Sequence, residues 1–406
     1  MPEAAVAQVR WRVAFVNTHP IQYFAPLYAH LQSHAGLDVT ALYLSDFSLR
    51  GGHDKGFGRA VAWDIDLLAG YKPEFMGQRA SRRQLGGYFS MVAPELWGAI
   101  RRGNFDAVVI HGHNFAAHQV ALAACLASAT PVLHRSETHL GLRRPRWKEA
   151  IRRPLLSRWY RAFDGFLAIG SANARYYRSM GIPAERIHRV PYAVDNERFM
   201  AAARQSGESR ARVRERLGLQ GSAPAILSAA KFEPRKRPDE LLEAFRRLQQ
   251  EGVEAQLVLA GSGQMEPQLK AMVARHGIRN VSFPGFINQA ELPQVYAACD
   301  VFVLPSDNEP WGLAVNEAMC AGLPVIVSGE IGCAEDLVAG GGNGATFPAG
   351  DIAALAGALR PLLVDEGARR QASRASALRI GAWGYAQCAE GLREAIGAAR
   401  AHRGFA

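Results

Sequence analysis

The sequence predicts an α/β protein made of two Rossmann-like domains whose parallel sheets face each other across a cleft. The chain has 406 residues, too many for one ordinary core and suited to two domains of about 200 residues each. Short runs rich in Val, Ile and Leu alternate with amphipathic segments of helical length. This alternation is typical of βαβ units around parallel sheets. It occurs twice, and we therefore expect two sheets.

The first half of the chain contains five apolar runs of strand length. We expect strands at residues 13–17, 39–44, 107–111, 131–135 and 165–169. Helices are expected between these strands, for example at residues 21–32 and 115–128. We assign residues 1–200 to this N-terminal domain.

The second half begins a new series of apolar runs. We expect strands at residues 225–228, 256–260, 281–283, 301–305, 325–328 and 345–347. The intervening segment 201–222 is polar and ends in Gly, Ser and Pro, which predicts a linker with one exposed helix and a hinge near it. We assign residues 201–382 to the C-terminal domain.

Composition narrows the class of protein. Hydrophobic residues make up 49% and charged residues 21%, as in ordinary globular enzymes. The net charge of +10 favours an anionic partner, which could be a nucleic acid, an acidic membrane or a phosphorylated substrate. The five cysteines form no CxxC pair, so neither zinc nor disulfides are indicated and a cytoplasmic location fits best. No run of eighteen apolar residues and no signal-peptide pattern occurs.

Ligands of open α/β sheets bind beyond the carboxyl ends of the strands, and one such loop carries two acids. Segment 306–322 follows an expected strand, and its Pro310 and Gly322 predict the start and stop of a helix. Free N–H groups at that start favour an oxyanion. Glu309 and Glu317 would be separated by about 12 Å along the axis, so each could hold ligand hydroxyls. The alternative is a helix-stabilising acid and a solvated glutamate.

Lys231 and Lys236 bracket the loop that follows the first strand of the second half. Two cations there can neutralise a diphosphate, although a solvated basic loop is the competing interpretation. Gly263 would let the backbone approach a ligand closely or simply make a tight turn. Phe286 and Ile287 follow the third strand and could wall a nucleobase or merely cap that strand.

Together these residues resemble the family-4 retaining glycosyltransferases of the GT-B fold, over nearly the whole chain. Glu309 and Glu317 meet the family's Glu-x7-Glu signature. The resemblance implies that Glu309 contacts the donor sugar and Glu317 the nucleotide ribose. It also places Lys231, where the family usually has Arg, and Lys236 on the donor phosphates. The run around the signature adds donor-site residues, namely Trp311, Gly312 and Leu313.

The first half matches that family more loosely. His19 lies in the segment that replaces the family's glycine-rich loop, and Glu137 stands where many members have a histidine near the anomeric carbon. We take Glu137 as a candidate catalytic group, with His19, Arg135, His139 and His113 as candidates for the acceptor side. A buried salt bridge between Arg135 and Glu137 is the alternative.

The resemblance implies transfer of a sugar from a UDP- or GDP-linked donor to an acceptor hydroxyl, with retention and with neither metal nor cofactor. The acceptor would be a glycan, a lipid-linked sugar or a small molecule, in polysaccharide, lipopolysaccharide or glycolipid biosynthesis. His111, His113 and His118 have spacing that could suggest a metal, but the family needs none. A sugar-nucleotide epimerase or hydrolase of the same fold is the alternative function. A nicotinamide-dependent oxidoreductase is disfavoured because the first βα turn lacks GxGxxG.

Segment 143–161 interleaves cations with aromatic residues on an expected helix. Such a helix suits anionic lipid headgroups, with Trp147, Leu155 and Trp159 dipping inward, or it is a solvated basic face over ordinary core residues. Because lipid-linked acceptors are common in the family, we expect contact with the inner face of the plasma membrane and no nucleic acid. The amphipathic segment 383–406 is expected to pack back on the first domain, as is typical of this fold.

Overall fold

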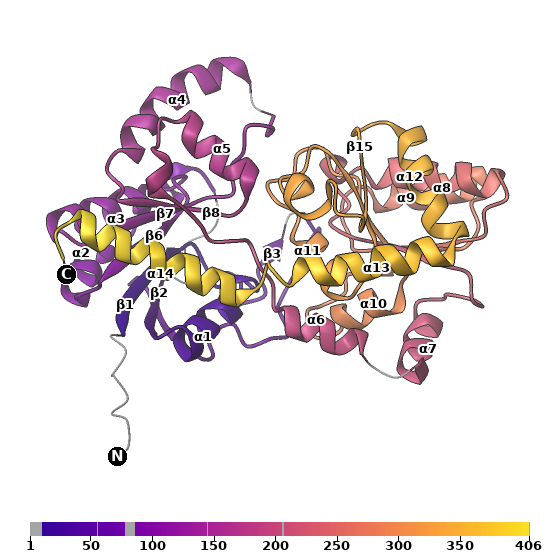
Figure 1. The fold of residues 1–406 in the computed structure, drawn as a ribbon, viewed down its shortest axis with the longest axis horizontal. Helices are drawn as coiled ribbons and strands as arrows, with labels where there is room; N and C mark the ends of the chain where they lie inside the picture. Colours follow the sequence, from indigo (N-terminus) through magenta and orange to yellow (C-terminus); the bar gives the residue numbers. More distant parts are fainter. Residues whose placement is uncertain (1–9, 55, 78–85, 144, 205–206, 406) are drawn as a thin grey trace.

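The computed structural model describes residues 10–54, 56–77, 86–143, 145–204 and 207–405. It consists of two α/β lobes that lie side by side (Figure 1). One lobe is built on a seven-stranded sheet and the other on a six-stranded sheet. All strand pairs within these two sheets are parallel. The predicted fold class is confirmed.

The first lobe contains all five strands that its apolar runs predict. In sheet order its strands are β5 (Lys72–Phe75), β2 (Leu37–Tyr43), β1 (Trp11–Asn17), β6 (Ala107–His111), β7 (Val132–Arg135), β8 (Gly165–Ala168) and β9 (Ile187–Arg189). The sequence did not predict the two edge strands, β5 and β9. Both carry polar residues and are at most half-buried, because an edge strand has only one neighbour and is commonly polar.

Among the described residues, six α-helices belong to the first lobe, and one of them comes from the far end of the chain. They are α1 (Phe24–His34), α2 (Glu95–Gly103), α3 (Ala116–Ala127), α4 (Arg146–Tyr160), α5 (Ser171–Ser179) and α14 (Tyr385–His402). Helix α14 contacts α1 and the strands β6 to β9, and it buries Cys388, Leu392 and Ile396 there. The last helix therefore belongs to the core of the first lobe (Figure 1).

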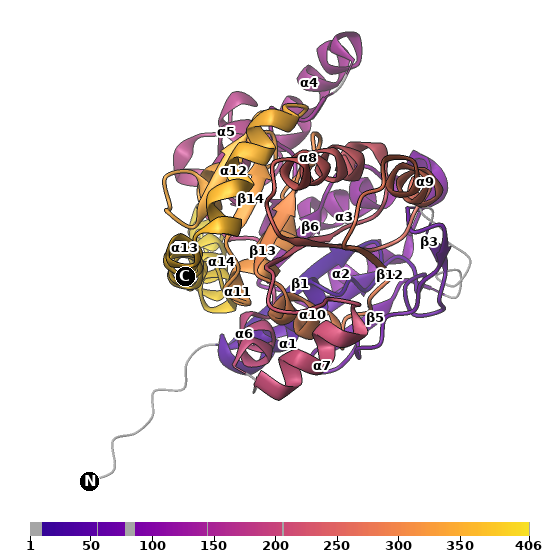
Figure 2. The ribbon, with the colours of Figure 1, turned by 90° about the vertical axis from the view of Figure 1, so that its right-hand side faces the viewer.

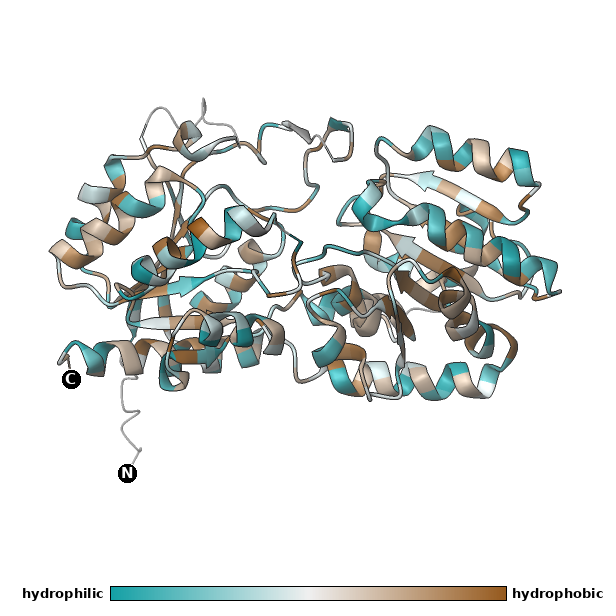
Figure 3. Ribbon diagram, turned by 90° about the horizontal axis from the view of Figure 1, so that it is seen from above, coloured by the Kyte–Doolittle hydropathy of each residue, from teal (hydrophilic) through white to brown (hydrophobic). Residues whose placement is uncertain are grey.

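The second lobe contains the six strands that its apolar runs predict. In sheet order they are β12 (Val281–Gly285), β11 (Gln256–Ala260), β10 (Ala225–Ala229), β13 (Val301–Leu304), β14 (Val325–Ser328) and β15 (Gly344–Phe347). In both lobes the buried strands are rich in hydrophobic residues, whereas the surrounding helices carry polar residues as well (Figure 3).

Helices lie on both faces of the second sheet (Figure 2). One face is covered by α8 (Pro238–Gln250), α9 (Glu266–His276) and α12 (Ile352–Val364). The other face is covered by α10 (Leu292–Ala298) and α11 (Leu313–Cys320), and α13 (Glu366–Ile380) packs against α11 and α12. The polar segment expected to be a linker contributes to α6 (Asn196–Ala203) and contains α7 (Gly207–Arg216). Helix α6 packs on α10 and α11.

Along the described ranges, the chain passes between the lobes after β9 and again before α14, and these two passages touch. The Asn196 side-chain amide donates a hydrogen bond to the carbonyl of Ile380 at 3.3 Å. The rings of Trp311 and Trp383 lie 5.3 Å apart beside the same junction. One continuous cluster of buried side chains includes residues of both lobes, so the lobes share part of their core.

Candidate functional site

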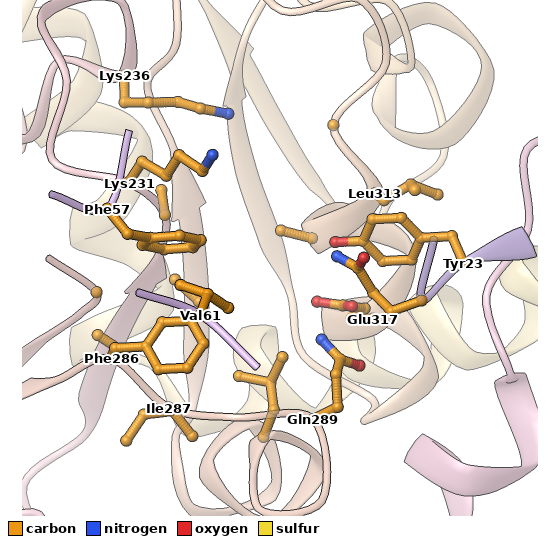
Figure 4. A pocket seen from close by; sticks show the side chains of 18 of the residues that line it. Tyr23, Phe57, Val61, Lys231, Lys236, Phe286, Ile287, Gln289, Leu313 and Glu317 are labelled. Carbon is orange, nitrogen blue, oxygen red and sulfur yellow. The ribbon is translucent and has the colours of Figure 1, made fainter. Parts of the chain in front are cut away.

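A cavity of about 390 Å³ lies between the lobes and is lined by both of them. From the first lobe it receives His19, Gln22, Tyr23, Phe47, Ser48, Gly52, Phe57, Val61, Trp63, Glu137 and Tyr192. Loops at the carboxyl ends of the second sheet provide Lys231, Lys236 and Glu309, and helix α11 provides Glu317. The acids and cations singled out in the sequence therefore face one cavity (Figure 4).

Glu309 is held between two cations of the loop that follows β10. Its carboxylate accepts a hydrogen bond from the Lys236 ammonium and lies 3.4 Å from the Arg235 guanidinium. Arg235 also pairs with Glu233 at 2.9 Å. A short 3-10 turn, Pro234–Lys236, brings Arg235 and Lys236 to the cavity. The basic loop is thus not simply solvated. Arg235 also lines the cavity, although only Lys231 and Lys236 of this loop were predicted from the sequence.

The helix that carries the second acid begins later than the sequence predicts. Helix α11 starts at Leu313 instead of Pro310, because Gly312 adopts φ +99° and closes the preceding loop. A side chain is strained in that left-handed region. Glu309 therefore lies in a loop, and the expected helical rise between Glu309 and Glu317 does not apply. Trp311, Gly312 and Leu313 line the cavity at the start of the helix.

Glu317 is a buried carboxyl group on the cavity wall, not a solvated one. It is 3% exposed, and its Oε2 accepts a hydrogen bond from the Tyr296 hydroxyl at 2.8 Å. Its Oε1 is buried without a hydrogen-bond partner. Burial raises the pKa of Glu317 to about 7, although the Tyr296 hydrogen bond opposes that shift. A buried oxygen that lacks a donor favours a ligand that brings a hydroxyl group.

Aromatic side chains line the cavity below the two lysines (Figure 4). Phe286 and Ile287 lie on its wall, where the sequence expects a nucleobase. Phe57 comes from the first lobe and meets Phe286 edge-on, with ring centroids 4.8 Å apart. The Lys231 ammonium lies 4.7 Å from the Phe57 ring centroid. Sequence reasoning missed Phe57 because it does not lie in a loop that directly follows an expected strand.

The two glycines of the loop after β11 have different surroundings. Gly261 lines the cavity, and a Cβ there would lie 2.0 Å from the Ala230 carbonyl oxygen. Gly263, the residue that the sequence singles out, does not line it. A Cβ at Gly263 would lie within 2.9 Å of the backbone of Phe232 and of Gly56. The close approach at Gly263 is therefore to protein backbone, and Gly261 is the glycine nearer to a ligand.

On the first-lobe side of the cavity, Glu137 is hydrogen-bonded to a tyrosine hydroxyl. The Tyr192 hydroxyl donates a hydrogen bond to Glu137 at 2.6 Å, and burial raises the pKa of Glu137. The described residues contain no salt bridge between Arg135 and Glu137. Arg135 instead donates to the carbonyl of Val190 at 3.3 Å, and its guanidinium lies over the rings of Phe24 and Tyr192.

Of the other acceptor-side candidates, only His19 lines the cavity. His139 crosses to the second lobe, where its Nε2 lies 3.0 Å from the carbonyl oxygen of Glu309. His113 lies outside the cavity lining and forms a hydrogen bond with the Arg152 guanidinium at 2.8 Å. His139 therefore contacts the backbone of the Glu309 loop, and His113 and Arg135 are part of the packing behind the site.

The described ranges contain no group of three or more His, Cys, Asp or Glu side chains arranged to hold a metal ion. His111 lies 3.4 Å from the Tyr28 hydroxyl, and His118 accepts from the Phe115 amide at 3.3 Å. Asp64 accepts from the Ala290 amide across the cleft at 3.0 Å. These side chains therefore serve packing and backbone hydrogen bonds.

The basic segment 143–161 forms α4 from Arg146 onward, and α4 protrudes from the first lobe (Figures 1 and 2). Trp159 is not directed outward; it donates to Gln119 at 2.7 Å and packs on Phe163. Arg143 pairs with Glu330 of the second lobe at 2.9 Å. Among the helices of the described ranges, none is both long and apolar enough to span a bilayer.

A two-lobed fold of parallel sheets with a charged cavity between the lobes is the architecture of the GT-B glycosyltransferases. Anabaena HepE, solved in complex with UDP and glucose, shares the fold with a TM-score of 0.71 and 19% identity over 96% of this chain and 100% of that chain. A sucrose-phosphate synthase from Thermosynechococcus elongatus shares it with a TM-score of 0.68 and 18% identity over 95% and 98% of the two chains.

Sequence comparison identifies the family. The model "Glycosyltransferase Family 4" matches residues 35–198, and "Glycosyl transferases group 1" matches residues 209–379. The D-inositol 3-phosphate glycosyltransferase of Streptomyces avermitilis is 30% identical over 330 residues, which are 76% of this chain and 69% of the relative. The chain belongs to glycosyltransferase family 4.

Other relatives match over shorter stretches. The D-inositol 3-phosphate glycosyltransferase of Xylanimonas cellulosilytica is 33% identical over 220 residues, 52% of each chain. A GDP-mannose-dependent α-(1-6)-phosphatidylinositol monomannoside mannosyltransferase of Mycolicibacterium smegmatis is 32% identical over 200 residues, 47% of this chain and 50% of the relative. The chain thus spans about half the length of these two relatives.

Proposed function

We propose that this protein transfers a sugar from a nucleoside diphosphate sugar to an acceptor hydroxyl, with retention of anomeric configuration and without a divalent metal. The observation that carries the proposal is that Lys231, Arg235 and Lys236 line one cavity with Glu309 and Glu317. A nucleotide sugar presents anionic phosphates and hydroxyl groups together, which is what these side chains bind. The UDP and glucose held by Anabaena HepE support this donor class.

The second lobe, residues 201–382, is the proposed donor domain. Lys231 and Lys236, with Arg235, would hold the diphosphate and stabilise the charge that develops on it as the glycosidic bond breaks. Glu317 would accept hydrogen bonds from the ribose and Glu309 from the sugar. Both UDP and GDP fit this scheme; the Mycolicibacterium smegmatis relative is named for GDP-mannose.

In the proposed reaction, the bond between the anomeric carbon and the phosphate oxygen breaks while the acceptor oxygen bonds to the same face of that carbon. The acceptor's proton passes to the departing phosphate oxygen. The first lobe, residues 1–200 with the terminal segment 383–406, would position the acceptor. Glu137 is its carboxyl group on the cavity, and the raised pKa favours the protonated form, which can donate a hydrogen bond.

A screen of nucleotide sugars by thermal unfolding tests the donor class, because a bound donor stabilises the folded protein. We expect one nucleotide series to raise the Tm and, with an acceptor, to give a product of unchanged anomeric configuration in the presence of EDTA. An inverted product, or activity lost with EDTA and restored by Mn²⁺, would contradict retention or metal independence. Rapid donor consumption without acceptor would indicate the epimerase or hydrolase instead.

We further propose that α4 contacts an anionic membrane surface and brings a lipid-linked acceptor to the cleft. Trp147, Ile151 and Leu155 recur every four residues on α4 and are exposed by 65%, 59% and 65%. Residues four apart share one face of a helix, so they form an unburied apolar stripe beside cations such as Lys148. A stripe of this kind binds at the boundary of headgroups and acyl chains. This would place the enzyme at the inner face of the plasma membrane.

Co-sedimentation with vesicles containing anionic phospholipid tests this contact. Ile151→Glu and Leu155→Glu should release the protein from the vesicles. Leu378→Glu is the matched control, because Leu378 is also a helical leucine, 81% exposed, but lies on α13 of the second lobe. Equal binding of all variants, or loss in the control alone, would overturn the assignment of α4.

A further inference from the structure

One segment of the first lobe reaches across the cleft to the second lobe. We call residues 56–64 the strap. The Ser262 hydroxyl donates a hydrogen bond to the carbonyl of Phe57 at 3.0 Å. The Asn288 side chain donates to the carbonyl of Ala62 at 2.9 Å. The strap is therefore fixed to the loops that follow β11 and β12, which carry part of the proposed donor site.

Side chains of the strap form one wall of the cavity. Phe57, Val61 and Trp63 all line it, and Figure 4 shows Phe57 and Val61 in a column with Phe286 below the two lysines. The Trp63 and Phe286 ring centroids are 6.1 Å apart. The Arg59 guanidinium lies over Phe286 at 5.3 Å from the ring centroid. Three strap residues thus surround Phe286 of the second lobe.

The strap is also closely fitted to Lys231. A Cβ at Gly56 would lie 2.6 Å from the Lys231 side chain and 2.4 Å from a Glu233 carboxylate oxygen. The Phe57 ring lies under the Lys231 ammonium. An apolar, aromatic wall therefore ends directly at a cation. Of the parts of a nucleotide sugar, only a nucleobase has a flat π face, and it is joined through a ribose to an anionic diphosphate.

We propose that the strap supplies the first-lobe half of the nucleobase subsite, with Phe57 and Trp63 as determinants of donor affinity. The inference rests on the proposed function and extends it to a segment of the other lobe. The base would lie against Phe57 and Phe286, the ribose near Glu317 and the diphosphate near Lys231. Aromatic side chains that stack on bases are each worth about 1–3 kcal/mol, a factor of about 5 to 150 in Kd. One nucleotide then contacts both lobes.

The experiment measures binding of UDP, GDP and ADP, and of inorganic pyrophosphate, by calorimetry. For the nucleotide that the wild type binds, Phe57→Ala and Trp63→Ala should each raise Kd about tenfold. Phe57→Tyr, which keeps the ring, should stay within about threefold of the wild type. Pyrophosphate, which has no base, should bind the wild type and Phe57→Ala alike. Phe89→Ala is the control, since Phe89 is a first-lobe phenylalanine that is 78% exposed and does not line the cavity.

The outcomes separate this inference from the proposed function. If the wild type binds none of the three nucleotides, the proposed function fails and the strap inference fails with it. If the wild type binds one of them and the folded strap variants bind it equally well, only the strap inference is overturned. If Phe57→Ala weakens pyrophosphate as much as the nucleotide, Phe57 acts by positioning Lys231 and base contact is refuted. Thermal unfolding identifies folded variants, and Trp63→Ala provides the test if Phe57→Ala does not fold.

Discussion

The two walls of the cavity are built on different electrostatic principles. On the second-lobe wall, Glu309 is paired with Lys236, and each side chain is 13% exposed. On the first-lobe wall, Glu137 is bonded to the hydroxyl of Tyr192, and burial raises the pKa of both groups. The second-lobe wall thus holds an ion pair at Glu309, beside the buried Glu317 that accepts from a tyrosine. The first-lobe wall presents only the second kind of arrangement, a buried acid bonded to a tyrosine hydroxyl. We call the two surfaces the ionised wall and the neutral wall.

Under the proposed function, this difference predicts separate roles for the two walls. Fixed charges in a partly water-excluded cavity stabilise a charged leaving group without rearranging during the reaction. Neutral hydrogen-bonding groups can orient an uncharged hydroxyl without attracting the diphosphate. We therefore expect changes on the ionised wall to affect the donor and the chemical step most, and changes on the neutral wall to have smaller effects that are confined to the acceptor.

The largest effect is expected for Lys236→Ala. The substitution removes a cation from the proposed diphosphate site and leaves the carboxylate of Glu309 with Arg235 alone. Loss of one such electrostatic contact lowers kcat by about 10²- to 10³-fold. Steady-state kinetics on the folded variant measures it. Lys270→Ala is the control, because Lys270 pairs with Glu266 on the surface; wild-type turnover in folded Lys236→Ala would remove the diphosphate assignment.

The next effect concerns Glu317, the buried acid of the second-lobe wall that has no ion-pair partner among the described residues. Glu317→Gln should raise the Kd of the donor by about 10- to 100-fold, because hydrogen bonds to a charged group are worth about 1.5–3 kcal/mol. Wild-type affinity should also rise with pH through about 7, since the carboxylate is the stronger acceptor. Calorimetry from pH 6 to 8 checks both points, and a pH dependence that survives in Glu317→Gln would assign it to another group.

The free energy of unfolding should fall as pH rises through the pKa of Glu317, whereas donor affinity rises. The pKa of Glu317 is raised from 4.5 to about 7 by burial, so the folded protein holds this proton to higher pH than the unfolded chain. Ionisation therefore lowers stability as pH rises from about 4.5 to 7, by up to about 3 kcal/mol. We expect Glu317→Gln, which cannot ionise, to have the higher Tm at pH 8 and a similar Tm at pH 4. A lower Tm at pH 8 would contradict this.

On the neutral wall, Glu137→Gln should lower turnover about tenfold, a loss of about 1.4 kcal/mol, and leave the Kd of the donor unchanged. Glutamine still accepts the hydrogen bond from Tyr192 but does not titrate. Kinetics with varied acceptor and calorimetry with donor separate the two quantities. A donor Kd that rises as much as turnover falls would place Glu137 on the donor side and remove the contrast between the walls.

The smallest effect is expected for Tyr192→Phe, which removes the hydroxyl group that donates to Glu137. A typical hydrogen bond contributes about 1 kcal/mol, so acceptor turnover should fall by about fivefold at most. The same assay as for Glu137→Gln measures it. In the double variant the second substitution should add little, because both remove one interaction; fully additive losses would show that the two residues act separately.

The sequence predicted the interior of both sheets because a strand covered on both faces is a continuous apolar run. It failed at the polar edges, β5 and β9, and at the start of α11, where the conformation of Gly312 overrides the helix signal of Pro310. In the site, the sequence singled out the loops that carry Lys231, Lys236 and Glu309 because each gathers charged residues in one short segment after a strand. Arg235 was hidden in a run of cations, because only the fold shows which of them faces the cavity.

The strap was not predictable from the sequence, since its contacts join loops about two hundred residues apart. Phe57 contacts Phe286, and Ala62 contacts Asn288. Neither segment has a hydrophobic periodicity from which its partner could be predicted. The same applies to the first-lobe wall, where the Tyr192 hydroxyl donates a hydrogen bond to Glu137, 55 positions away in the sequence. Sequence patterns report what a segment does locally, whereas these contacts arise only when the lobes are assembled.

The contact between Asn196 and Ile380 has a practical consequence for dissecting the enzyme. Because the second lobe is entered and left at one point, residues 196–380 form an uninterrupted fragment with adjoining ends. We expect this fragment to be producible alone, by closing its ends with a short connector or by leaving them open. The first lobe cannot be produced as one continuous fragment. A C-terminal truncation that removes the second lobe also removes α14, which is part of the core of the first lobe.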